Sequence, residues 1–313
     1  MVTTPVRESE PQPAPSGFGF RVHTRVPLRF LRSGGGVEPL EIVVASGPRP
    51  RPGRAPLADW PLAGGDHDVR GTLYQAERGF EFWTTDAGAY RIDLETGRIE
   101  IPEHPDDVVR EQRLWGIPAA LCVMYRGDIP LHAAAVQLGA GAILLAGPRR
   151  HGKTTLALAF HRQGYRVLSE DLACCRPTPV PTLLPGPALL RLRPDVYDGM
   201  PPPGTHVVAS RPDRVYLAMD DGRKGSGAPV PIAAIVFLRR WTDGIALEPM
   251  SPADALRALW GLSLHLPSDA ARARAFSQLT RLVGTLPLWN LDRPGRLDSL
   301  DPTVEQIVQV CRV

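Results

Sequence analysis

The stretch that decides the fold is Leu131–Cys175, which reads LHAAAVQLGAGAILLAGPRRHGKTTLALAFHRQGYRVLSEDLACC. Two apolar runs, Leu131–Leu138 and Ala142–Ala146, are followed by a glycine-containing loop and by a helical pattern over Thr154–Arg162. A further apolar run over Arg166–Ser169 comes next. Strands that alternate with a helix in this way predict an α/β core.

The loop of this stretch, Gly147–Thr154, fits the pattern G-x-x-x-x-G-K-[ST]. Gly147 and Gly152 allow the backbone to approach a phosphate closely. The backbone N–H groups and the N-terminus of the following helix then point at the anion. We expect Lys153 to reach the β- and γ-phosphates of ATP and Thr154 to place its hydroxyl on Mg²⁺. The alternative is a glycine-rich turn with a solvated lysine. It would not explain why a strand precedes the loop and a helix follows it.

The lysine of the loop is one of two in the chain, Lys153 and Lys224, against many arginines. Because the chain otherwise uses arginine, a lysine at position 153 indicates that the loop needs a compact point charge. Arg150, His151 and Thr155 are further candidates for contact with the nucleotide. For the first two, the alternative is that they point into solvent.

Composition excludes several classes of protein. The chain has 313 residues and a formal net charge of +3, which is too small to indicate binding to nucleic acid or to a membrane surface. The segment Met1–Ser16 is rich in proline and lacks the apolar core of a signal peptide. The four cysteines show no metal-ligand spacing, and the adjacent Cys174 and Cys175 are expected to be buried thiols on opposite faces of a strand. These features predict a cytoplasmic protein.

The domain organisation follows from the patterns along the chain. We expect a disordered tail over 1–16, a β-rich domain over 17–105, a linking helix within 106–130 and a nucleotide-binding domain over 131–313. Strands of the β-rich domain are predicted at 18–23, 28–31, 40–45, 73–76, 80–85, 89–94 and 98–101, with a loop over 47–66. The linking helix is predicted over Asp107–Arg126, with a kink at Pro118 and an end at Gly127.

The C-terminal part continues the α/β pattern as a mixed sheet with helices. Strands are predicted at 172–176, 215–219, 232–239 and 286–291, and a short strand or turn at 189–193. Helices are predicted at 194–200, 252–262, 269–283 and 302–311. Ser251 and Ser268 are the expected N-caps of the second and third of these helices.

Three side chains near the loop narrow the chemistry. Glu170 and Asp171 follow the strand directly after the loop's helix. One carboxylate is expected to bind Mg²⁺, and the other to accept the proton of an attacking hydroxyl. His132 precedes the loop by 15 residues, on an adjacent strand. We interpret it as a site residue, the alternative being a packed polar side chain.

Together, His132 in Leu-His-Ala-Ala-Ala-Val, the loop Gly147–Thr154 and the pair Glu170-Asp171 resemble the catalytic domain of HPr kinase/phosphorylase, whose fold is similar to the nucleotide core of phosphoenolpyruvate carboxykinase. More closely, the chain resembles the HPr-kinase-like proteins encoded beside ribosomally made peptides, including lasso-peptide tailoring kinases. The resemblance extends from about Leu131 to the C-terminus.

The resemblance implies roles for single residues. Glu170 takes the general-base position and Asp171 the position near the metal and His132. Glu170 is one methylene longer than the usual Asp, so the two roles are open to exchange. No segment matches the Glu-Ile-Arg-Gly-type signature linked to phosphorylase activity, which argues against a bifunctional regulator. The family also makes a homo-oligomer plausible.

Three basic residues are accessory candidates: Arg191, Arg193 and Lys224. A basic side chain from a later loop would neutralise the transferring phosphoryl group. The alternative for each is surface charge.

The sequence therefore predicts an ATP- and Mg²⁺-dependent kinase that phosphorylates a serine-type hydroxyl of a peptide or protein, with a ribosomally made precursor peptide as the expected acceptor. Two alternatives stay open. One is a small-molecule kinase that uses the same site, and the other is a non-catalytic module that binds a nucleotide and a partner.

Overall fold

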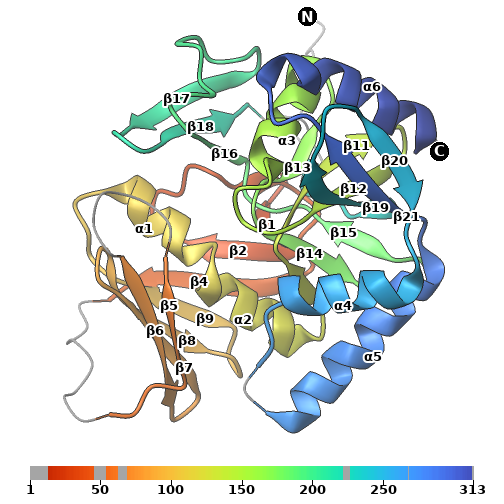
Figure 1. Ribbon diagram of the computed structural model, residues 1–313. Helices are drawn as coiled ribbons and strands as arrows, with labels where there is room; N and C mark the ends of the chain where they lie inside the picture. Colours follow the sequence, from red (N-terminus) through yellow and green to blue (C-terminus); the bar gives the residue numbers. More distant parts are fainter. Residues whose placement is uncertain (1–12, 46–53, 63–68, 221–225, 267, 312–313) are drawn as a thin grey trace, which may run out of the picture.

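The computed structural model describes residues 13–45, 54–62, 69–220, 226–266 and 268–311. Within these residues the chain is an α/β protein with two nine-stranded sheets and a three-stranded sheet (Figure 1). Most of the expected tail, most of the expected loop over 47–66, and Lys224 lie outside the described residues. None of the described helices is both long and apolar enough to cross a bilayer.

The N-terminal sheet has the strand order β3-β1-β2-β4-β9-β8-β7-β6-β5. Its strands are β1 (Pro15–Gly17), β2 (Phe20–Thr24), β3 (Arg32–Ser33), β4 (Glu38–Val44), β5 (Ala58–Pro61), β6 (Arg70–Ala76), β7 (Gly79–Thr84), β8 (Gly88–Asp93) and β9 (Arg98–Ile101). Six of the seven predicted strands overlap these. The strand predicted over 28–31 is wrong, since the chain bends there, and β5 lies inside the predicted loop. Strands as short as β1, β3 and β5 carry too few residues for a period-two pattern to show.

The predicted linking helix is two helices, α1 (Asp107–Leu114) and α2 (Ile117–Arg126). The predicted kink at Pro118 is therefore wrong. The first helix ends at Leu114, and a second helix begins at Ile117. Pro118 lies in the first turn of α2, where its missing N–H costs no hydrogen bond. Gly127 ends α2 in the left-handed conformation, with a φ of 94°, as expected.

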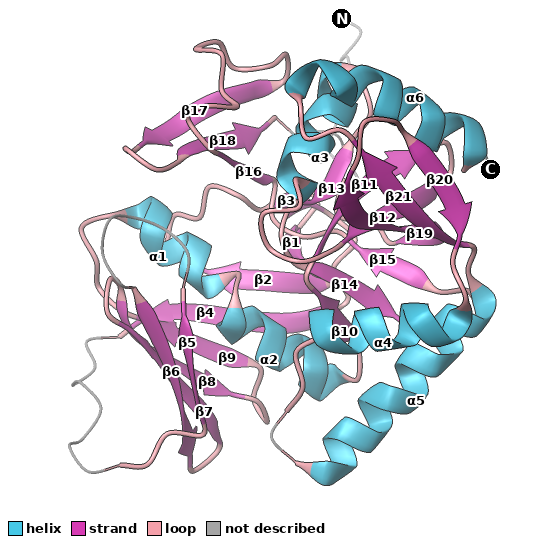
Figure 2. Cartoon of the chain, viewed as in Figure 1, coloured by secondary structure: helices cyan, strands magenta, loops and turns pink. Residues whose placement is uncertain are grey.

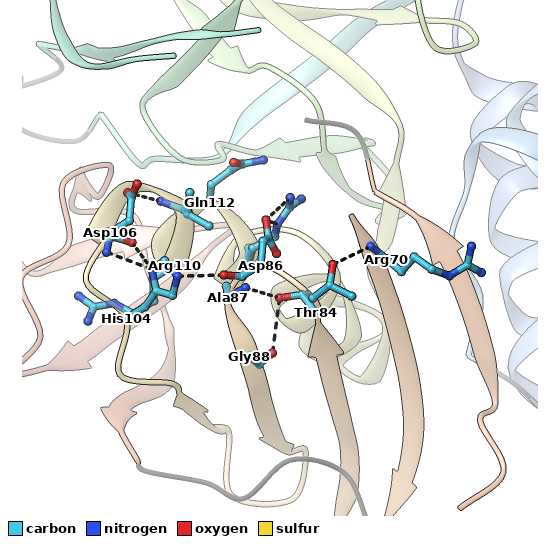
Figure 3. Close-up of polar contacts among 12 residues, drawn as sticks. Arg70, Thr84, Asp86, Ala87, Gly88, His104, Asp106, Arg110 and Gln112 are labelled. Atoms are coloured by element: carbon cyan, nitrogen blue, oxygen red, sulfur yellow. Dashed lines mark hydrogen bonds and ion pairs between the residues drawn. The ribbon is translucent and has the colours of Figure 1, made fainter. Parts of the chain in front are cut away.

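A polar cluster fixes the start of α1 (Figure 3). Asp106 caps the helix by accepting hydrogen bonds from two backbone N–H groups of its first turn, both at 3.1 Å, and its other oxygen pairs with Arg211. His104 accepts from the backbone N–H of Asp106 at 3.0 Å and donates through Nε2 to the carbonyl of Asp86 at 2.9 Å. Asp86 also pairs with Arg113 of α1 at 2.6 Å. The cluster thus joins α1 to the N-terminal sheet and to the segment of Arg211.

The second large sheet has the order β10-β14-β15-β19-β12-β11-β13, with β21 beside β19 and β20 beside β21. Its strands are β10 (Ile129–Leu131), β11 (Ala133–Leu138), β12 (Gly141–Ala146), β13 (Val167–Ser169), β14 (Ala173–Arg176), β15 (Thr182–Leu184), β19 (Val230–Trp241), β20 (Ala246–Pro249) and β21 (Leu288–Arg293). The sheet is mixed, as predicted, because β12 pairs with β11 in antiparallel and with β19 in parallel fashion.

Helices cover both faces of this sheet (Figure 2). Helices α3 (Lys153–Arg162) and α6 (Leu300–Val310) pack on one face, and α4 (Pro252–Leu262) and α5 (Asp269–Thr285) on the other. The strand β12 shows the period-two alternation of a buried strand, since Ile143 and Leu145 face the first pair of helices and Leu144 faces the second. Cys174 and Cys175 are buried free thiols in separate hydrophobic clusters, which confirms the prediction for them.

The predicted helix caps are confirmed. Ser251 Oγ accepts from the N–H of Asp254, and Ser268 Oγ accepts from that of Ala271, both at 3.2 Å. The short helix predicted over 194–200 is wrong, because that segment forms turns. Gly199 has a φ of 90°, which is not a helical conformation, and prolines follow from Pro201 on. Only five residues, 194–198, are then left for a helix.

The third sheet contains β16 (Leu189–Leu192), β18 (Val215–Met219) and β17 (Thr205–Ser210), in that order. It lies beside α1 and α3 in Figure 1 and pairs with neither large sheet among the described residues. Tyr216 of β18 lies within 3.3 Å of the side-chain oxygen of Gln112 in α1.

A buried arginine joins the two large sheets. Arg32 of β3 donates through Nε to the carbonyl of Gly186 at 2.6 Å, and through Nη2 to the carbonyls of Val167 and Leu168 at 3.0 and 3.2 Å. Its side chain is fully enclosed, and this burial, followed by the charge of Arg166, lowers the pKa of Arg32 to about 9. The N-terminal sheet therefore holds the strand β13, although Arg32 and Val167 are 135 residues apart in the sequence.

We predict that Arg32→Met lowers the free energy of unfolding by about 3 kcal/mol, because a buried acceptor left without its donor costs about 1–3 kcal/mol. Urea unfolding measures this. The control Arg25→Met removes an exposed arginine nearby and should stay within about 0.5 kcal/mol of the wild type. Equal effects of the two substitutions would show that Arg32 does not join the sheets.

Candidate functional site

The loop Gly147–Thr154 lies where the sequence predicts it, between β12 and the first turn of α3. Gly152 has a φ of 81° and Arg150 a φ of 66°, so the loop turns twice through the left-handed region. This conformation is unfavourable for a residue with a Cβ, by about 1–2 kcal/mol. A Cβ on Gly147 would lie 3.0 Å from the carbonyl oxygen of Leu238. The loop is therefore closely packed at its start and backbone-strained at its centre, as occurs at ligand-binding turns.

The sheet topology brings three segments to one edge beside this loop. Strand β11 lies between β12 and β13 and is antiparallel to both. The carboxyl ends of β12 and β13 therefore meet the amino end of β11. The loop follows β12, Glu170 and Asp171 follow β13, and His132 precedes β11. The sequence places His132 within a strand, whereas the structure places it in a break between β10 and β11, where its backbone N–H donates to the carbonyl of Leu262 at 2.7 Å.

The Lys153 ammonium group is saturated with acceptors. Nζ lies 2.7 Å from the carbonyl oxygen of Gly147, 2.9 Å from that of Pro148 and 2.9 Å from Nε2 of His132. An ammonium group has three hydrogens to donate, and each has a partner here. Burial lowers the pKa of Lys153 to about 8, against the opposing charges of Asp171 and Glu170. Lys153 is thus folded back into the loop.

His132 connects the lysine to the acidic pair. Because Nε2 faces the Lys153 donor, it accepts, and Nδ1 carries the ring proton. Nδ1 lies 3.3 Å from Oδ1 of Asp171 and 3.2 Å from the backbone carbonyl of the same residue. The imidazole therefore receives a hydrogen bond from the ammonium group and donates one to the carboxylate.

The two acids share a basic partner. Arg191 of β16 approaches Glu170 Oε2 through Nε at 2.8 Å and Asp171 Oδ2 through Nη2 at 2.7 Å. Thr154 Oγ1 donates to Glu170 Oε1 at 2.6 Å. Burial disfavours the charged form of Asp171, but the guanidinium of Arg191 and the hydrogen bond from His132 outweigh this and hold its pKa well below the usual range. Asp171 is therefore a carboxylate.

The other sequence candidates divide into two groups. Arg150 is exposed on the loop, and His151 is half-buried, with Nδ1 3.1 Å from the carbonyl oxygen of Arg149. Thr155 is half-buried in the first turn of α3. Arg193 is exposed and pairs with Asp195 at 2.6 Å. The structure thus brings Arg191 to the acids and leaves Arg193 outside.

Sequence reasoning missed two contributors to this site. Arg32 holds the strand that carries the acids, and the carbonyl of Leu262 holds His132. No local pattern identifies either, because one is a single arginine in a two-residue strand and the other acts through its backbone.

Comparison of the chain with known proteins finds a weak structural similarity. No family model matches the chain, and no curated protein matches it. Among solved structures, the HPr(Ser) kinase/phosphatase from Coxiella burnetii is similar at 10% sequence identity and a TM-score of 0.30. The match covers 58% of this chain and 95% of that one. The relationship to HPr kinase indicated by the motifs therefore stays a prediction.

We predict that Lys153→Met weakens binding of ATP with Mg²⁺ by at least about tenfold, since a hydrogen bond to a charged group contributes about 1.5–3 kcal/mol. Isothermal titration calorimetry measures the dissociation constant. The control Arg162→Met removes an exposed cation at the other end of α3, which pairs with Asp198, and should bind ATP as the wild type does. ATP binding that survives in Lys153→Met would mean that the loop does not hold the phosphates.

Proposed function

We propose that the chain is an ATP-dependent kinase that transfers the γ-phosphate to a hydroxyl group of a peptide or protein. One observation carries the proposal. Lys153, His132 and Asp171 form one hydrogen-bonded chain and Thr154 and Glu170 a second, and Arg191 joins the two at the N-terminus of α3. A phosphate cradle and two carboxylates next to it are the parts that phosphoryl transfer to a hydroxyl requires.

Binding of the triphosphate would draw on the loop and on Lys153. Its negative charge favours the N–H groups at the start of α3 and the ammonium group. Lys153 then exchanges the carbonyls of Gly147 and Pro148 for phosphate oxygens. Because an adjacent anion stabilises the charged amine, the exchange offsets the effect of burial on the pKa of Lys153.

The oxygen atoms near the loop suit Mg²⁺. Thr154, Glu170 and Asp171 offer a hydroxyl and two carboxylates, which are the hard ligands that this ion prefers. No group of three or more His, Cys, Asp and Glu among the described residues is placed to hold a metal by itself. This fits a site in which phosphates complete the coordination, as is usual for Mg²⁺. When bound, the ion would neutralise charge on the β- and γ-phosphates.

The geometry favours an exchange of the two acidic roles implied by the resemblance. The Glu170 side chain is 8% exposed and bonded to Thr154, whereas the Asp171 side chain is 49% exposed. Asp171 is therefore the acid that an incoming hydroxyl would meet, and Glu170 the acid beside the metal ligand Thr154. In the transfer, the acceptor oxygen forms a bond to the γ-phosphorus, the bond from that phosphorus to the β–γ bridging oxygen breaks, the acceptor proton passes to Asp171, and ADP leaves.

The acceptor class rests on the resemblance of the motifs. A small metabolite is the competing acceptor, and both are tested together. The protein is incubated with γ-labelled ATP, Mg²⁺ and either the short peptide encoded beside its gene or a metabolite pool. Label on the peptide supports the proposal, label on a metabolite alone replaces the acceptor class, and ATP binding without transfer to either leaves a nucleotide-binding module.

We predict that Asp171→Asn lowers the turnover number by about 10²–10⁴-fold, the usual contribution of a general base, with ATP affinity kept. Glu170→Gln should instead raise the Mg²⁺ concentration needed for half-maximal transfer. Initial rates of transfer against ATP and Mg²⁺ measure both. The control Asp195→Asn removes an exposed acid that pairs with Arg193 and should leave the rates unchanged. The reverse pattern in the two site variants would restore Glu170 as the base.

A further inference from the structure

Arg191 lies where a cation between the two acids would lie. Its guanidinium contacts one oxygen of Glu170 at 2.8 Å and one of Asp171 at 2.7 Å, and its side chain is 19% exposed. A guanidinium is protonated at any physiological pH, so Arg191 compensates the repulsion between the two neighbouring carboxylates.

Each carboxylate oxygen of the pair has a donor. Glu170 Oε1 accepts from Thr154, Asp171 Oδ1 faces His132, and the remaining oxygen of each acid faces Arg191. A divalent cation that binds both acids must displace a donor from each of them, and Arg191 is the donor that the two acids share. The guanidinium and the metal ion therefore compete for one position.

The strand that carries Arg191 belongs to a different sheet from β13, the strand that the two acids follow. Arg191 is in β16 of the three-stranded sheet, opposite Tyr216 of β18, whereas β13 belongs to the large sheet (Figure 1). Withdrawal of the guanidinium breaks no pairing between the strands of the large sheet. Its planar fork also fits phosphate oxygens as well as carboxylates.

We propose that Arg191 holds the cation position between Glu170 and Asp171 in the nucleotide-free protein, leaves it when the metal–nucleotide complex enters, and then pairs with the phosphate oxygens. The inference rests on the proposed function for its last step. Its first step, competition with a divalent cation, is independent of any transfer activity.

An ordinary structural ion pair leads to the opposite expectation. If Arg191 merely supported the acids, its removal would disorder them and weaken metal binding. If it occupies the cation position, its removal vacates that position and leaves two carboxylates without their counter-ion. Metal binding then becomes tighter while phosphoryl transfer becomes slower.

The test is binding of Mn²⁺ to the nucleotide-free protein, followed by the electron paramagnetic resonance signal of the free ion. We expect Arg191→Met to bind Mn²⁺ about tenfold more tightly than the wild type, since removal of one competing charge-assisted contact amounts to about that factor. The control Arg193→Met removes an arginine two positions away, whose partner is Asp195, and should match the wild type. The double variant Arg191→Met/Asp171→Asn should lose the gain.

Mn²⁺ affinity in Arg191→Met that equals or falls below the wild-type value would overturn the inference. Thermal denaturation shows whether this variant folds. If it does not, Arg191→Lys decides, because a single ammonium group keeps the charge but lacks the fork that reaches both acids. Its Mn²⁺ affinity should lie above that of the wild type, and an unchanged value would overturn the inference. Failure of the kinase proposal would appear separately, as absence of transfer with the Mn²⁺ results intact.

Discussion

The contact between Lys153 and His132 is the interaction on which the site depends. It joins the loop after β12 to the residue before β11, and through Asp171 to the segment after β13. The three segments meet because β11 is antiparallel to both neighbours. A buried ammonium group needs its acceptors, so the position of His132 and the closure of the loop onto Lys153 support each other. Without His132, the lysine would lose the acceptor that points it toward the acids.

In the structure, the polar side chains of the site bond to one another and to the backbone of the loop. Lys153 is bonded to the carbonyls of its own loop, Thr154 to Glu170, and Arg191 to both acids. In the proposed function, these same groups hold a nucleotide and its metal ion. Entry of a ligand therefore exchanges internal partners for phosphate and metal, at a smaller desolvation cost than if bare charges had to be buried.

The N-terminal sheet supports the site mainly from outside the loop, which it contacts through Arg149 Nη1 and the carbonyl oxygen of Pro61 in β5 at 3.5 Å. Arg32 of β3 holds the carbonyls that precede Ser169, Glu170 and Asp171. The polar cluster around Asp106 connects α1 to Arg211, in the connection between β17 and β18, and β18 pairs with the strand of Arg191. Both the acids and their arginine are thus positioned by contacts that run back to the first hundred or so residues.

The sequence predicts those features of the fold and the site that neighbouring residues determine. The loop lies between the strand and the helix that were expected on either side of it. The helix caps at Ser251 and Ser268 and the helix end at Gly127 are also as expected. The break at His132 was not predictable, since it depends on pairing with Leu262. Nor could Arg191 be distinguished from Arg193. They lie two positions apart, and Arg193 is diverted because β16 ends at Leu192 and Asp195 is close by. Strand β5 and the other short strands carry too little pattern to be recognised.

A crystal structure with Mg²⁺ and a non-hydrolysable ATP analogue tests the central claim most directly. The account predicts the triphosphate on the loop, Lys153 released from the carbonyls of Gly147 and Pro148 onto phosphate oxygens, and the metal ion beside Thr154 and Glu170. A triphosphate bound elsewhere, with Lys153 still bonded to its own loop, would contradict it.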